Sequence, residues 1–170
     1  MRRVAGALLA AAAALHAAPA FAQSNGTTVN AVARASVLKP LTLTGQQNLN
    51  LGTFLLGRGA FSSATVSVSR TGTRTCPAVL TCSGVVTVAR YQLTGSNNQT
   101  IAISAPPVVL TNTANAAQRL TLTLDAPASI VLPNSGNQGV QFSVGGNLTL
   151  SSATPEGTYA GTLEITVNYN

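Results

Sequence analysis

Hydrophobic and polar residues alternate along most of the chain after residue 28. A period of two places successive side chains on opposite faces of an extended strand. Beyond residue 22 we find no convincing run with the helical period of about 3.6 residues. The alternating runs predict strands at residues 29–37, 41–44, 64–69, 85–93, 100–104, 108–111, 119–125, 140–144, 148–150 and 159–169.

Turn-forming residues separate these runs at regular intervals. Gly, Pro, Asn and Ser gather at residues 57–59, 95–98, 133–136, 145–146 and 155–158. Short strands with regular turn signals are typical of antiparallel sandwiches and barrels. We expect a single all-β domain over residues 29–170, an antiparallel β-sandwich, with a barrel as the less favoured alternative.

The last run has the clearest alternation. Its even positions are mostly polar and include Glu164, so one face suits a core and the other suits water. We therefore predict one continuous terminal strand. The core-facing side chains in it are Tyr159, Leu163, Ile165, Val167 and Tyr169.

The first 22 residues have the organisation of a signal peptide. Arg2 and Arg3 precede a nearly unbroken apolar run at residues 4–18, and small residues end the segment. This pattern predicts cleavage between Ala22 and Gln23. The apolar run is shorter than the roughly 20 residues that a membrane span needs. We expect an exported protein with a short polar lead at residues 23–28 and no membrane span, in the periplasm or on the surface of a bacterium.

Composition narrows the classes of function. Charged residues make up 7% of the chain, aromatic residues 4%, and Trp is absent. The part after Ala22 carries seven basic and three acidic side chains, a formal charge of +4. The basic residues are scattered, whereas a nucleic-acid-binding surface has a basic stripe. We therefore predict no nucleic-acid partner.

Groups suited to catalysis are scarce. His16 is removed with the predicted signal peptide, which leaves Lys39, Asp125, Glu156 and Glu164. A Ser-His-Asp triad needs a histidine, and a glycosidase needs two facing carboxylates. Glu156 lies in a predicted turn and Glu164 on a polar strand face, so both are read as surface residues. We predict that the protein is not an enzyme and uses no metal or cofactor.

Two cysteines lie close together in sequence. Cys76 and Cys82 are separated by five residues. Exported proteins meet an oxidising compartment, where a disulfide is the expected state. A metal site would need further ligands that the chain lacks. We predict a disulfide that staples a loop or a hairpin tip and does not join two sheets.

Several segments resemble parts of bacterial pilus subunits. The terminal segment, with Gly157, Tyr159 and a penultimate Tyr169, resembles the C-terminus of fimbrial subunits and of spore-coat-type secreted domains. Residues 29–43, an alternating run that reaches Pro40, resemble the N-terminal segment of colonisation-factor-type fimbrial subunits. Residues 50–52 and 142–150 contribute looser strand patterns. Over residues 23–170 the chain most resembles a bacterial secreted family of unknown function with an Ig-like, pilin-like sandwich, and this resemblance implies an Ig-like, pilin-like antiparallel fold.

The resemblance implies a mechanism of assembly. Pilin domains lack one strand, and a neighbour's N-terminal segment fills the resulting groove by backbone pairing. The terminal strand would border that groove, and a periplasmic chaperone could hold it before assembly. The alternative is that residues 29–37 form the first strand of their own complete domain. The candidate donor side chains that would face the groove are Val29, Ala31, Ala33, Ala35 and Val37.

Two functions follow from these readings. The first is a structural or adhesive protein, a surface-fibre subunit whose partners are like subunits. The second is a monomeric cell-envelope module with a complete sandwich that binds a glycan or a protein on the cell surface. The oligomeric state of residues 23–170 discriminates between them.

Overall fold

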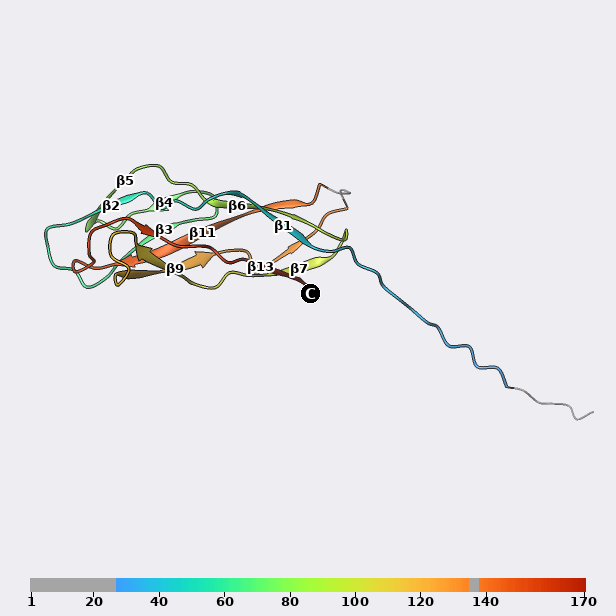
Figure 1. The fold of residues 1–170 in the computed structure, drawn as a ribbon. Coiled ribbons are helices and arrows are strands. Elements are labelled where there is room, and N and C mark those ends of the chain that lie inside the picture. Colours follow the sequence, from blue (N-terminus) through green and yellow to red (C-terminus); the bar gives the residue numbers. More distant parts are fainter. Residues whose placement is uncertain (1–26, 135–137) are drawn as a thin grey trace, which may run out of the picture. The chain divides into compact units, whose positions relative to one another are not determined.

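A computed structural model describes residues 27–134 and 138–170. The predicted signal peptide and its cleavage site between Ala22 and Gln23 lie outside these residues. The chain divides into two units, Met1–Ala35 and Ser36–Asn170, which are described separately. In the described residues the secondary structure consists of strands (Figure 1), and no helix among them is long and apolar enough to cross a membrane.

All the strands belong to the second unit. Most coincide with runs of alternating residues, because alternation lets one face contact the core while the other contacts water. The strands are β1 (Thr42–Gln47), β2 (Thr53–Leu56), β3 (Ala64–Val68), β4 (Arg74–Thr75), β5 (Leu80–Ser83), β6 (Ala89–Thr94), β7 (Thr100–Ser104), β8 (Val108–Asn112), β9 (Arg119–Asp125), β10 (Ser129–Val131), β11 (Val140–Leu150), β12 (Tyr159–Ala160) and β13 (Thr166–Tyr169).

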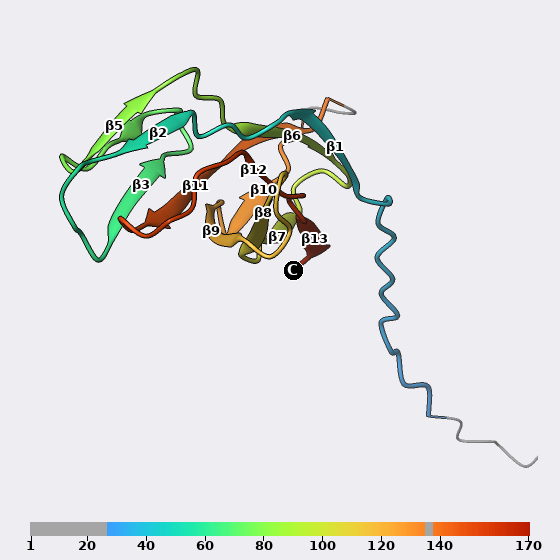
Figure 2. The same cartoon turned by 60° about the vertical axis from the view of Figure 1, so that its left-hand side comes forward.

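The strands form three antiparallel sheets. The largest has eight strands in the order β1-β6-β11-β9-β8-β12, with β3 pairing β11 and β4. Figure 2 shows that this sheet curls strongly. A three-stranded sheet has the order β10-β7-β13, and β2 pairs with β5 alone. The predicted all-β, antiparallel fold is confirmed.

The core consists of two clusters of buried side chains. Both are aliphatic apart from Phe142, as a chain without Trp requires. Partly buried residues, among them Leu49 and Leu163, pack against both clusters. The first cluster is Ala64, Val66, Leu80, Val108, Leu110, Leu122, Leu148 and Leu150, and the second is Ala89, Leu93, Ile101, Leu132, Phe142 and Val144.

Strand β11 passes unbroken through Gly145 and Gly146, so the turn predicted there is wrong. Gly146 pairs with Val68 of β3 and also with Leu124 of β9. A Cβ atom on Gly145 would overlap the backbone oxygen of Val68. These glycines allow the strands to approach closely, which is the other common role of glycine within a strand.

The terminal run is not one continuous strand. It divides into β12, which pairs with β8, and β13, which pairs with β7 in another sheet. The odd positions 159, 163, 165, 167 and 169 are nevertheless half-buried, while the residues between them are exposed. The sequence pattern reports which way a side chain faces, but it carries no information on which strand the backbone pairs with.

Residues 27–40 contain no strand and are exposed. Val29, Val32 and Val37 are 84%, 82% and 94% exposed. The interpretation of residues 29–37 as the first strand of their own domain is therefore corrected, because the first strand is β1. Alternation makes a segment able to form a strand, but a strand also needs a neighbour for its backbone hydrogen bonds.

Candidate functional site: an open apolar groove

A groove with a volume of about 1040 Å³ opens along one side of the second unit. Two segments border it, residues 47–56 (the first lip) and residues 154–163 (the second lip). Its floor is formed by side chains from β6, β8, β9 and β11. These floor residues are Ala89, Tyr91, Leu110, Leu120, Leu122, Leu148 and Leu150.

The first lip offers unpaired backbone groups. Asn50 exchanges two hydrogen bonds with Thr87, at 2.9 and 3.0 Å, so both of its backbone groups point away from the groove. In an antiparallel pair the neighbouring residues point their backbone groups to the opposite edge. Leu49 and Leu51 therefore direct their N–H and C=O groups toward the groove, while their side chains pack on the first cluster.

The second lip also has unpaired backbone groups, in the residues that follow β12. Residues 161–165 form no backbone hydrogen bond with any other part of the chain that the structure describes. Pairing stops at Ala160 and resumes only at Thr166. Unpaired backbone at the edge of a sheet is a ready template for a further strand.

Asn112 holds the second lip in place. Its side chain is 3% exposed, and its Nδ2 donates to Glu156 O at 3.0 Å and to Gln118 Oε1 at 2.6 Å. Its Oδ1 accepts from Ala114 N at 3.0 Å. Gly157, with φ of 143°, lies against this amide, and a Cβ atom there would overlap it. A buried amide with these hydrogen bonds satisfied fixes the lip against β8.

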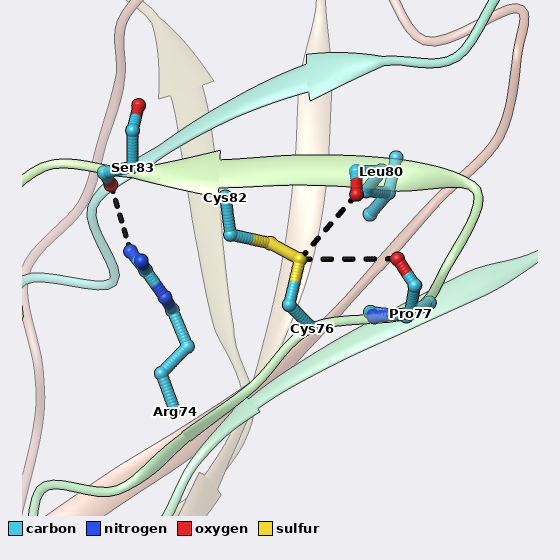
Figure 3. The surroundings of a disulfide bond; sticks show 6 residues. All are labelled: Arg74, Cys76, Pro77, Leu80, Cys82 and Ser83. Atoms are coloured by element: carbon cyan, nitrogen blue, oxygen red, sulfur yellow. Dashed lines mark hydrogen bonds between the residues drawn. A yellow bond between two sulfur atoms is a disulfide. The ribbon is translucent and has the colours of Figure 1, made fainter.

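A disulfide links β5, the strand that pairs with β2 of the first lip, to the loop that precedes it (Figure 3). Cys76 and Cys82 are bonded, with Cα atoms 6.1 Å apart, as the sequence predicted. Cys82 lies in β5 opposite Phe54 of β2, and both side chains pack on the first cluster. The Arg74 guanidinium also donates to Ser83 O at 2.7 Å. The bond closes a local loop, as predicted. The strands on either side of it, β4 and β5, belong to different sheets, whereas the sequence had predicted that the disulfide does not join two sheets.

The carbonyl oxygens of Pro77 and Leu80 lie 3.8 and 3.6 Å from the Cys76 sulfur. Figure 3 marks both contacts. A disulfide sulfur carries no hydrogen, so these contacts are not hydrogen bonds. The loop is held by the covalent bond and by the backbone hydrogen bond from Leu80 N to Pro77 O at 2.9 Å.

The floor of the groove is apolar, whereas the two lips add polar but almost uncharged groups. Tyr91 on its floor stacks on Phe142, with ring centroids 5.4 Å apart and an interplanar angle of 22°. Burial raises the pKa of the Tyr91 phenol. Glu156 is the one charged side chain among the described residues that line the groove. Such a surface suits an apolar or alternating segment and disfavours an ionic ligand.

Residues suited to proton transfer do not meet in the groove. Glu156 lies on the second lip, and Glu164 lies beyond it, with both side chains exposed. Lys39 lies outside the groove-lining residues. Among residues 27–134 and 138–170, no three His, Cys, Asp or Glu side chains gather as metal ligands would.

The sequence placed part of this site. Tyr159 and Leu163 of the predicted terminal strand line the groove, whereas Ile165, Val167 and Tyr169 pack on the second cluster. The candidate donor residues, Val29, Ala31, Ala33, Ala35 and Val37, are not among its lining residues. Sequence reasoning missed the first lip and Asn112. The alternation of Leu49 and Leu51 with asparagine and glycine was the available signal for the first lip.

Fold and groove together define an all-β domain with an open groove over an apolar floor. The chain belongs to the protein family described as "Domain of unknown function (DUF4402)", whose model matches residues 41–169. That range contains both lips and the whole floor. Comparison with the curated proteins and with the solved structures found no match to this chain.

Proposed function

We propose that this protein is an exported, non-enzymatic structural or adhesive protein that assembles into a surface fibre by β-strand donation. Its domain is then an Ig-like, pilin-like sandwich that lacks one strand. The supporting observation is the groove itself, because an apolar floor lies between two lips that each contain unpaired backbone, at Leu49 and Leu51 and at residues 161–165, among the residues that the structure describes. A strand added there would satisfy both lips and cover the floor.

The donor in this proposal is residues 29–37 of a like subunit. Val29 and Val37, at its two ends, are 84% and 94% exposed and so have apolar surface to bury. The side chains between them on the same face are alanines, which bury little area at about 25 cal/mol per Å². Backbone pairing with both lips therefore supplies much of the affinity, and each net hydrogen bond contributes about 0.5–1.5 kcal/mol.

Export is part of the same proposal. The disulfide between Cys76 and Cys82 is the state expected in an oxidising compartment such as the periplasm or the cell surface. A free subunit with an open apolar groove is prone to aggregate. A periplasmic chaperone that covers the groove before assembly is therefore the expected partner.

A pair of variants of the exported chain, residues 23–170, tests strand donation. Ala33→Asp places a charge on the face of the donor that enters the groove, whereas Val32→Asp places the same charge on the opposite face. We expect unheated gels and light scattering to show oligomers for the natural protein and for Val32→Asp, and their loss for Ala33→Asp. A charge in an apolar groove is costly, and a charge facing water is not.

Added peptide provides the second arm of the test. A synthetic peptide of residues 28–38 should raise the thermal midpoint of residues 23–170, and the same peptide with Ala33→Asp should not. A protein that stays monomeric at high concentration and ignores the peptide refutes strand donation. That result would favour the alternative, a monomeric cell-envelope module that binds a glycan or a protein.

A further inference from the structure

Three residues far apart in sequence are joined where the chain enters β1. The backbone N–H of Lys39 donates to Ser96 Oγ at 2.6 Å. The Tyr169 hydroxyl donates to Lys39 O at 2.6 Å and accepts from Ser96 N at 2.8 Å. We call Lys39, Ser96 and Tyr169 the clasp. Both backbone groups of Lys39 are thereby fixed, and Pro40 further restricts Lys39 to extended conformations.

The clasp ties together the two segments that diverge to form the groove. Leu41 precedes β1, which continues toward the first lip, and Tyr169 ends the run that begins in the second lip. A Cβ atom on Gly95 would lie 2.7 Å from Leu41 Cδ2 and 2.7 Å from Tyr169 Oη, so both side chains crowd the backbone of Gly95 next to the clasp. An inserted strand needs about 4.7–4.9 Å on each side. No strand can enter while the clasp is closed.

The groove-lining residues agree with a closed end. Leu163 and Tyr159 line the groove, whereas Leu43 of β1 and Val167 of β13 do not and pack on the second cluster. The accessible part of the groove therefore begins near Gln47 and Leu163, at a distance from the clasp. A strand must enter this part from elsewhere than the clasp.

This geometry decides which copy can supply the strand. Residues 29–38 span at most about 35 Å when fully extended. The segment is attached to its own domain at Lys39, eight residues before Gln47, where the accessible groove begins. The segment must therefore use about 26 Å of its length to reach that end of the groove from outside. Only about two or three residues would then remain to pair with the lips. The same segment of a second copy is attached to a different domain, so its reach is not limited in this way.

We propose that the clasp prevents a subunit from filling its own groove and so directs residues 29–37 into a second copy. This inference rests on the proposed function, because it concerns the same groove and the same donor. Opening of the clasp would let residues 29–37 fold back between β1 and β13 of the same copy, next to Lys39. Tyr169 and Ser96 are then positioning residues that favour assembly over self-closure.

A cross-linking experiment distinguishes the two routes. Arg34→Cys on the donor and Thr162→Cys beside the second lip are introduced together into residues 23–170. Isotopically heavy and light preparations are mixed, unfolded, refolded and treated with a short bismaleimide. Mass spectrometry of the linked peptides then reports whether each link joins two copies or lies within one. With the clasp intact, we expect links between two copies, so that heavy-light linked peptides form in the proportion that random pairing of heavy and light chains gives.

Clasp variants should change this distribution. Tyr169→Phe removes two hydrogen bonds while keeping the ring, which favours the open clasp by about 5- to 150-fold. Ser96→Ala removes the acceptor for Lys39 N and should act in the same direction. Both variants should raise the share of links within one copy. Ser104→Ala, an exposed serine in β7 outside the clasp and groove, should leave the share unchanged.

Failure of strand donation and failure of the role of the clasp give different results in this experiment. Absence of any link between residues 34 and 162 overturns the proposed strand donation itself. Links that fall mainly within one copy while the clasp is intact overturn the role of the clasp and leave groove filling standing. The same conclusion follows if both Tyr169→Phe and Ser96→Ala give the label distribution of the natural protein.

Discussion

Replacing Asn112 by alanine should loosen the second lip and destabilise the fold. The side chain is 3% exposed and forms three hydrogen bonds, to Gln118, Glu156 and Ala114. Alanine removes all three and leaves an empty space beside Gly157. The partners on the lip are close to solvent, so water can recover part of the loss.

The magnitude follows from the hydrogen bonds. Each contributes about 0.5–1.5 kcal/mol, so the loss of three lowers the free energy of unfolding by about 2–4 kcal/mol. Asn115 is a matched control, because it is exposed and its Oδ1 accepts one hydrogen bond, from Ala117 N at 3.1 Å. Its replacement by alanine should cost less than about 1.5 kcal/mol.

Urea unfolding of residues 23–170 measures both values. With a dependence of about 2 kcal/mol per M, Asn112→Ala should lower the midpoint by about 1–2 M. Gly157→Ala should destabilise the Asn112→Ala protein less than it destabilises the natural protein, because the amide that its Cβ overlaps is gone. This difference should exceed about 0.5 kcal/mol. Equal losses for Asn112→Ala and Asn115→Ala, or no coupling with Gly157, would contradict the role assigned to Asn112.

Three further predictions concern the core, the disulfide and pH. Gly145→Ala should destabilise the fold more than Gly146→Ala in urea unfolding, because its Cβ would overlap backbone atoms of β3 whereas that of Gly146 first meets the flexible tip of a leucine side chain; equal losses would contradict this. Replacing Cys76 and Cys82 by serine should lower the free energy of unfolding by about 2 kcal/mol, the estimate for so short a loop, and added reductant should then have no further effect. Burial raises the pKa of Tyr91 in the folded state above its unfolded pKa of about 10. The stability that the neutral phenol contributes is therefore fully present below the unfolded pKa. It is lost as the pH rises through the folded pKa. Tyr91→Phe should flatten the fall of the urea midpoint above that pH, and an unchanged slope would contradict the assignment.

Local alternation predicted most of the strands because it depends only on neighbouring residues. The runs at residues 100–104 and 119–125 coincide with β7 and β9. Within β9, Leu122 is 1% exposed while Thr121 and Thr123 face solvent. One face of a strand is buried wherever a sheet covers a core, so the period of two appears in the sequence.

Predictions failed where the outcome depends on contacts between distant segments. A Gly-Gly pair is a common turn signal, but Gly145 and Gly146 lie in a strand between close neighbours. The terminal run keeps its alternation while its backbone changes partner between β12 and β13. Neither the crowding at a glycine nor the identity of a pairing strand is encoded in adjacent residues.

The all-β fold, the bond between Cys76 and Cys82 and the inward-facing side chains of the terminal run could all be predicted from residue order alone. These properties follow from composition, spacing and period. The groove between residues 47–56 and 154–163, and the clasp near one end of it, became visible only once the strands were placed in space. A groove exists where a neighbouring strand is missing, and that depends on how every other strand has paired.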